Sequence, residues 1–154
     1  MRITDWLSRQ FTEINAISMS RNDIRHLQDN DATLNAVRQY AANDRWPNDT
    51  TEELRFFKKS RDKICFGTSG ELFIRNDNQL KLVLPQCLTN VVIQAYHDDI
   101  GHPGFEKTLS EISSRYIWYT MAADIKEFVR TCHQCRACRS RPFQQTSPCL
   151  SVRI

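Results

Sequence analysis

Residues 96–135 read YHDDIGHPGFEKTLSEISSRYIWYTMAADIKEFVRTCHQC. Four side chains in this stretch suit zinc. His97 and His102 have four residues between them, and Cys132 and Cys135 form a Cys-x-x-Cys pair. Zinc prefers four nitrogen or sulfur ligands in a tetrahedron, and four protein ligands leave no position for a catalytic water. The spacing therefore predicts one structural Zn²⁺ held by these four residues.

Apolar residues around these ligands repeat at helical spacing. A first helix carries Leu88, Val91, Val92 and Ala95, a second carries Phe105, Leu109 and Ile112, and a third carries Ile125, Phe128, Val129 and Cys132. The Gly-His-Pro-Gly turn at 101–104 separates the first two, and the third begins after Tyr119 or Thr120. This periodicity predicts a three-helix bundle over residues 87–138, with the Cys132 thiolate on the inner face of the third helix.

Such a bundle needs its metal. A domain of ~40–50 residues rarely buries enough apolar surface to fold alone. Structural zinc contributes roughly 10–16 kcal/mol in small domains, so we expect a folded zinc-bound segment and a largely unfolded metal-free one.

Cys138 and His133 are alternative candidates for the metal ligands. Cys135 and Cys138 form a second, overlapping Cys-x-x-Cys pair, and His133 could replace a thiolate. We favour Cys132 and Cys135 because Cys132 falls on the apolar face of its helix. Of the other cysteines, Cys65 and Cys87 are expected in the core and Cys149 on a tail.

The pattern changes to that of strands before the bundle. The runs KICF, ELFIR and LKLVLP are separated by the turn-forming clusters GTSG and NDNQ. This predicts a small antiparallel sheet over residues 52–86 and an α+β fold in which a sheet extension precedes the zinc-stabilised bundle.

The two ends of the chain show weaker signals. Residues 1–50 are interpreted as a tail or linker, with one or two short amphipathic helices after Arg21 that break near 29–31, and 46–51 as a loop. The polar, proline-containing residues 139–154 are interpreted as a flexible tail.

Composition limits the classes of function. Of 154 residues, 40% are hydrophobic and 25% charged, which is ordinary for a globular protein. No run approaches the ~18 apolar residues of a membrane span, and the start lacks a secretory core. We therefore expect an intracellular protein, in the nucleus or cytoplasm, with reduced cysteines and with no membrane partner or small-molecule substrate.

Positive charge gathers toward the end of the chain. From residue 100 onward eight Lys and Arg face four acids, whereas the net charge of the whole chain is +3. A basic C-terminal segment favours a polyanion such as DNA, although a solvated basic surface would look the same. The candidate phosphate contacts, on or after the third helix, are Lys126, Arg130, Arg136, Arg139 and Arg141.

Taken together, residues 96–135 resemble the His-His-Cys-Cys zinc-binding domain of integrases from gypsy-type retrotransposons and retroviruses. The resemblance lies in the ligand spacing, the GHPG turn, the Lys107-Thr108 pair, Trp118 and the DIKEFVRTCHQC ending. Residues 52–86 resemble the extension that precedes this domain. One departure is Trp118-Tyr119-Thr120-Met121, where many relatives have Trp-Pro-Gly-Met, so the turn into the third helix is expected to differ.

The first residues add a weaker resemblance. ITDWLSRQ is similar to the segment that closes the ribonuclease H domain of gypsy-type polyproteins, which implies that Asp5 corresponds to an active-site metal ligand there. The family continues into a catalytic core with three carboxylates, for which this chain has no room. We therefore expect no enzyme activity and assign no catalytic residue.

The resemblance implies a non-catalytic zinc-binding integrase module of a retrotransposon Pol polyprotein, which supports DNA binding and multimer assembly. One alternative is a host-retained protein-interaction or dimerisation module that uses an apolar face at Ile117, Trp118 and Tyr119. Another is part of a split integrase or reverse transcriptase. A carboxylate site built from Asp98, Asp99 and Asp124 is rejected, because Asp98 and Asp99 adjoin a predicted ligand at a helix end.

Overall fold

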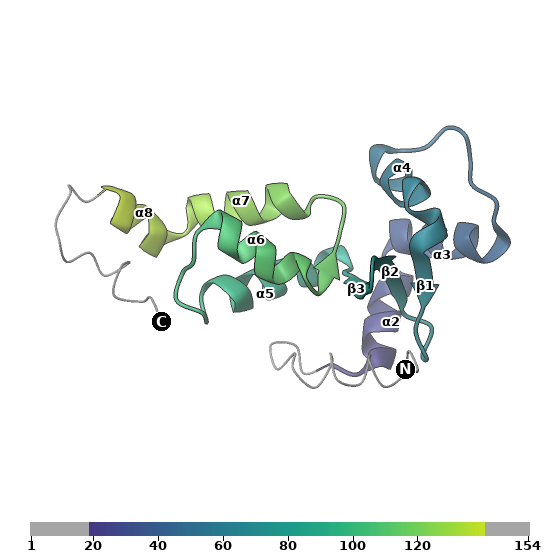
Figure 1. The fold of residues 1–154 in the computed structure, drawn as a ribbon, viewed down its shortest axis with the longest axis horizontal. Helices are drawn as coiled ribbons and strands as arrows, with labels where there is room; N and C mark the ends of the chain where they lie inside the picture. Colours follow the sequence, from purple (N-terminus) through teal and green to yellow (C-terminus); the bar gives the residue numbers. More distant parts are fainter. Residues whose placement is uncertain (1–18, 141–154) are drawn as a thin grey trace.

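The computed structural model describes residues 19–140 (Figure 1). In chain order the elements are α2 (Arg21–Asn30), α3 (Ala32–Asn43), α4 (Glu52–Lys59), the 3₁₀ helix η1 (Arg61–Lys63), β1 (Ile64–Phe66), β2 (Leu72–Asn76), β3 (Gln79–Val83), α5 (Gln86–His97), α6 (Phe105–Ser113), β4 (Tyr116–Ile117), α7 (Met121–Thr131) and α8 (His133–Ser140). The α+β class is confirmed. No helix within residues 19–140 is long and apolar enough to cross a membrane. Asp5, Arg141 and Cys149 lie outside the described residues.

The predicted antiparallel sheet is formed by β1, β2 and β3, and a fourth strand extends it. The strand order is β1-β2-β3-β4, and β4 runs parallel to β3. The Leu82 amide donates to the Arg115 carbonyl at 2.9 Å, and the Leu84 amide donates to the Ile117 carbonyl at 3.0 Å. Sequence analysis missed β4 because two residues are too few to show alternation. The zinc-bundle segment thus contributes a strand to the sheet of the preceding segment.

The sheet separates two apolar cores. Residues paired directly across antiparallel strands point to the same face. Phe73 and its partner Leu82 belong to the larger core, together with Val92, Ile112, Ile125 and Val129 from the bundle. Leu72, Ile74 and Val83 point to the other face and pack with Leu34, Val37 and Phe57 from α3 and α4. In Figure 1, α5–α8 extend away from one side of the sheet, while α3 and α4 lie at the opposite end of the molecule.

Residues 52–59 form helix α4 where the sequence suggested the start of the sheet segment. The Thr51 side chain caps it by accepting a hydrogen bond from the Leu54 amide at 3.3 Å. Leu54 and Phe57, three residues apart, turn toward the smaller core. The helix was not predicted because this single helical repeat directly precedes a segment with the sequence pattern of β-strands.

The helices expected within a tail or linker are part of the folded core. The predicted break near 29–31 is confirmed: α2 ends at Asn30, and the Asp31 carboxylate then accepts from the Thr33 and Leu34 amides at the start of α3. Ile24 of α2 lies in the larger core, and Leu34 of α3 lies in the smaller one. Residues 21–43 therefore help to form both faces of the sheet unit.

A buried glutamine joins α2 to the sheet. The Gln28 Nε2 donates to the carbonyls of Val83 at 2.7 Å and Leu72 at 3.3 Å, and its Oε1 accepts from the Leu72 amide at 2.8 Å. The side chain is completely buried. It thus satisfies backbone groups at the end of the β2–β3 ladder that have no access to water.

Replacement of this glutamine should be costly. Gln28→Ala would leave buried backbone groups unpaired, and we expect a loss of about 2–4 kcal/mol in the free energy of unfolding, measured by urea denaturation. Gln39→Ala, on the exposed side of α3, is the matched control and should change stability by less than about 0.5 kcal/mol. Equal losses in the two variants would contradict a bridging role for Gln28.

The two cysteines expected in the core differ in their exposure to solvent. Cys65 is half-buried and packs against the larger core, whereas Cys87 is exposed on α5. The prediction for Cys87 was therefore wrong. Cys87 directly precedes Leu88 and falls on the outer side of a helix whose opposite side faces the core.

Candidate metal centre

The first two candidate ligands are brought together by a left-handed turn. His97 is the last residue of α5, and the chain reverses through Gly101 (φ 96°) and His102 (φ 58°). Glycine adopts positive φ without the steric cost that a side chain brings. The His102 amide donates to the His97 carbonyl at 2.7 Å, and the two imidazole rings lie 4.9 Å apart at 89°. The turn therefore presents both rings to the same point in space.

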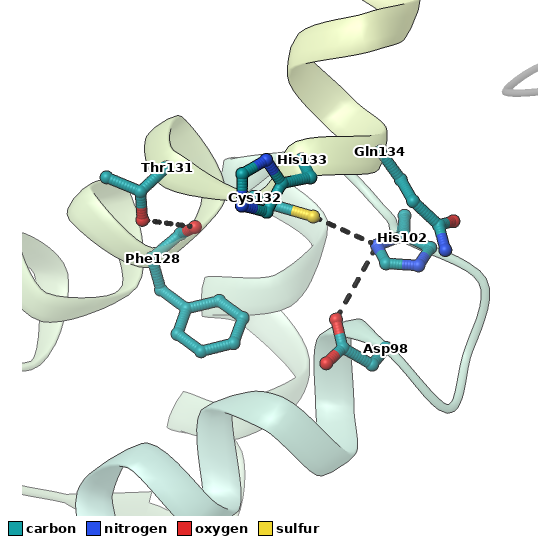
Figure 2. Close-up of a pocket in the computed structure, with 7 residues that line it drawn as sticks. All are labelled: Asp98, His102, Phe128, Thr131, Cys132, His133 and Gln134. Carbon is teal, nitrogen blue, oxygen red and sulfur yellow. Dashed lines mark hydrogen bonds and ion pairs between the residues drawn. The ribbon is translucent and has the colours of Figure 1, made fainter.

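The two cysteines lie on either side of a break between helices. Helix α7 ends at Thr131, and Cys132 has extended backbone angles (φ −62°, ψ 125°). Cys135 then lies in the first turn of α8 and is buried in the larger core. Sequence analysis placed Cys132 on the third helix itself, whereas it is the residue just beyond the helix. The break turns both thiols toward the histidines, and Figure 2 shows Cys132 pointing toward His102 between α7 and α8.

The four side chains form one compact group. The Cys132 Sγ lies 3.3 Å from His102 Nδ1, and the Cys135 Sγ lies 3.4 Å from His97 Nε2. All four potential ligand atoms are within 4.8 Å of one another. In a tetrahedral site with Zn–S near 2.3 Å and Zn–N near 2.0 Å, neighbouring sulfur and nitrogen atoms are ~3.5 Å apart. The cluster therefore fits one zinc ion.

The environment of His97 suits a metal ligand as well. His97 is completely buried, and burial lowers its pKa; the nearby His102 lowers that pKa further. Zinc requires neutral imidazole and deprotonated thiol, so a ring that resists protonation is prepared for binding. The Asp98 carboxylate lies 3.6 Å from His102 Nδ1, the ring nitrogen that also faces the Cys132 thiol (Figure 2).

Apolar and polar contacts hold the group in place. The Phe128 ring packs edge-on against His97, with centroids 5.7 Å apart. From α6, the buried Thr108 hydroxyl donates to the Gly104 carbonyl at 3.0 Å, which fixes the end of the turn. Beside the cluster lies an open pocket of about 510 Å³, drawn in Figure 2 and lined by Asp98, His102, Phe128, Thr131, Cys132, His133 and Gln134.

The competing ligands lie outside this group. Within residues 19–140, the cluster of His97, His102, Cys132 and Cys135 is the only gathering of three or more His, Cys, Asp or Glu side chains suited to a metal. His133 is exposed and lines the pocket, and Cys138 lies further along α8.

The Asp124 carboxylate forms hydrogen bonds within the protein, which agrees with the rejection of a carboxylate site at Asp98, Asp99 and Asp124. Its carboxylate accepts from the Trp118 indole at 2.8 Å and from the Thr120 hydroxyl at 2.7 Å. These bonds shape the turn into α7, where the sequence departs from the family pattern. Trp118 is buried in the larger core, and only Tyr119 of the proposed apolar face is exposed. Tyr119 packs on Phe56 of α4, with ring centroids 5.8 Å apart.

The candidate phosphate contacts occupy different environments. Lys126 and Arg136 are exposed, on α7 and α8. Arg130 is also exposed, but its guanidinium donates to Glu127 at 2.6 and 2.9 Å, and this hydrogen bonding raises the Arg130 pKa. The Glu127–Arg130 spacing of three on a helix is a sequence signal that could have predicted this pairing. Arg139 lies in α8, and Arg141 lies outside the described residues.

Comparison with known proteins identifies the zinc-cluster segment. Residues 84–141 match the family described as "Integrase zinc binding domain". The chain is also similar to the Transposon Tf2-3 and Tf2-4 polyproteins of Schizosaccharomyces pombe (strain 972 / ATCC 24843), with 28% identity over 90 residues. The alignment covers 57% of this chain and only 6% of each polyprotein.

No solved structure matches the fold significantly. The family match includes all four residues of the cluster, and its limits enclose α5–α8 and β4. Residues 84–141 therefore match the integrase zinc-binding domain family, and the chain is similar to part of retrotransposon polyproteins.

Proposed function

We propose that this chain acts as a non-catalytic, zinc-folded module of a retrotransposon Pol polyprotein, contributing to DNA binding and multimer assembly during integration. The observation that carries the proposal is the closed cluster of four ligands within an integrase zinc-binding domain. Zinc with four protein ligands has no open position for water, so its contribution is to folding. His97, His102, Cys132 and Cys135 would hold the ion.

In this proposal the metal positions a basic helix. Cys135 anchors the first turn of α8, so zinc would fix the direction in which α8 leaves the bundle. Residues 133–140 contain Arg136 and Arg139 and no acidic residue. Arginine side chains contact backbone phosphates without reading base sequence. Arg136, Arg139 and Arg141 are therefore the stronger candidates, with Lys126 as a further contact, whereas Arg130 would first have to leave Glu127.

Salt dependence of DNA binding tests the proposal. The zinc-bound chain should bind duplex DNA, and Arg136→Ala/Arg139→Ala should reduce the slope of log affinity against log salt by about 1.8 over about 50–200 mM salt. The measurement is fluorescence anisotropy with labelled DNA. The matched control is Arg45→Ala/Arg75→Ala, which removes the same charge from two exposed positions outside the zinc-binding domain.

The possible results separate clearly. An unchanged slope in the α8 variant would exclude these arginines as contacts. A wild-type chain that binds no DNA, yet forms a stable dimer by light scattering, would favour the protein-interaction alternative. The proposed location is intracellular, in the nucleus or cytoplasm, because a zinc–thiolate site needs reduced cysteines.

A further inference from the structure

A second basic segment lies far from α8 in the sequence. Residues 55–63 read RFFKKSRDK, with a net charge of +4. The basic side chains are Arg55, Lys58, Lys59, Arg61 and Lys63, and the one acid is Asp62. This density of positive charge exceeds that of α7, where Lys126 and Arg130 are balanced by Asp124 and Glu127.

Two further acids, Glu52 and Glu53, lie in the first turn of α4, so α4 and η1 together carry a net charge of +2, with the basic residues toward the C-terminal end. Glu52 pairs with Arg55 at 2.8 Å, whereas Glu53 accepts a hydrogen bond from the Thr33 hydroxyl of α3, which leaves its negative charge in place. Asp62 lies 3.9 Å from Arg61, and its side chain is 91% exposed. Ion pairs of this kind between exposed groups are weak.

Lysines account for most of the remaining charge. Lys58 donates to the Pro47 carbonyl at 2.8 Å, a contact that orients the ammonium without cancelling its charge. Lys59 and Lys63 are both exposed. The positive charge of the segment is therefore available to solvent.

The segment has a buried apolar face and an exposed basic face. Phe57 is buried, and Leu54 and Phe56 pack against the smaller core, which commits the apolar side of α4 to the sheet unit. Lysines in the last turn of a helix also stabilise its C-terminus, which would explain Lys58 and Lys59 alone. Arg61 and Lys63 lie beyond the end of α4, in the three-residue η1, so stabilisation of the α4 C-terminus does not account for them.

The basic segment is structurally connected to the zinc-binding domain. Phe56 of α4 packs on Tyr119, which lies just before α7. In Figure 1, α4 and α7 lie along the same upper edge of the molecule. Because β4 also pairs with β3, the segment and the domain belong to one folded body.

We propose that α4 and η1 form a second phosphate-binding surface, which contacts the backbone of the same duplex DNA that α8 is proposed to bind. The inference rests on the DNA binding proposed above and adds a surface outside the integrase zinc-binding domain. Duplex DNA presents one negative charge per ~1.7 Å of its axis, so an exposed basic strip has many equivalent partners. Lysine is a flexible point charge, which suits contacts that do not depend on base sequence.

The test uses the full zinc-bound chain with Lys59→Ala/Lys63→Ala. Loss of two phosphate contacts should reduce the slope of log affinity against log salt by about 1.8, and by the same amount on DNA of unrelated sequence. Arg45→Ala/Arg75→Ala again serves as the control for net charge and should leave the slope unchanged. Circular dichroism and zinc content should match the wild type, because both lysines are exposed.

The outcomes distinguish the two proposals. If the wild type binds DNA and the α8 variant loses slope, but Lys59→Ala/Lys63→Ala does not, this inference is overturned and the proposed function stands. Equal losses in the lysine variant and the control would also overturn it, because net charge alone would then explain both. If the wild type shows no salt-dependent binding, the proposed function itself fails.

Discussion

Removal of zinc is expected to unfold α5–α8 while leaving much of residues 21–83 folded. Zinc binding contributes roughly 10–16 kcal/mol in small domains, which is as large as the whole stability of a typical domain at ~5–15 kcal/mol. The smaller core on the far face of the sheet contains no member of the four-ligand cluster. Chelation should therefore lower the helical circular dichroism signal in part, with hydrogen exchange accelerated in α5–α8 and protected amides retained in β2 and β3.

Substitution of a single ligand should reproduce this effect. Cys135→Ser is expected to abolish stoichiometric zinc and the folding of α8, because the Cys135 thiol lies both in the cluster and in the larger core. Cys87→Ser makes the same chemical change at an exposed position and should retain one zinc per chain. A Cys135→Ser protein with full zinc content would mean that Cys138 or His133 completes the site.

The second large effect concerns the limits of the zinc-binding domain. A shortened chain that begins at residue 84 would lose β3 and the side chains of Phe73, Leu80 and Leu82 from the larger core. Burial of each such side chain contributes about 1.5–3 kcal/mol, so the total loss is about 5–9 kcal/mol. We expect this fragment to be poorly folded even with zinc, with broad unfolding and weak near-ultraviolet circular dichroism.

The control for truncation is a chain that begins at residue 19 and contains every described element. It should unfold cooperatively with zinc bound. The expectation would be disproved if the fragment from residue 84 unfolded as sharply and at the same denaturant concentration as the longer chain. That result would mean that the apolar contacts across β3 contribute little to the stability of the bundle.

Local spacing in the sequence was sufficient to predict the zinc-ligand cluster and the helices around it. Apolar spacing predicted α5, α6 and α7, because each buries a continuous apolar stripe over more than two turns. The spacing of His97, His102, Cys132 and Cys135 predicted the cluster, because zinc chemistry constrains both the residue types and their separation. The position of Cys132 just after α7 was not predictable, since its extended backbone is set by contacts that the periodicity does not include.

Contacts between residues far apart in the sequence could not be predicted from local sequence patterns. The contacts of Gln28 join residues 44 and 55 positions apart, and a single polar residue within an amphipathic helix gives no sign of its partners. Strand β4 is recognisable only through its pairing with β3. The same reasoning explains why residues 21–43 were interpreted as a linker: their apolar stripe was visible, but the surface that it covers is formed by distant strands.

The parallel pairing of β3 with β4 also bears on the order of folding. Parallel neighbours need a crossover connection, and here α5 and α6 form it, so β4 cannot join the sheet until both helices have been synthesised. The β1–β3 meander contains only local pairings, which close with little loss of chain entropy. During translation the N-terminal sheet can therefore form first and serve as a template, and capture of the metal becomes the final step because Cys135 is the last ligand to emerge.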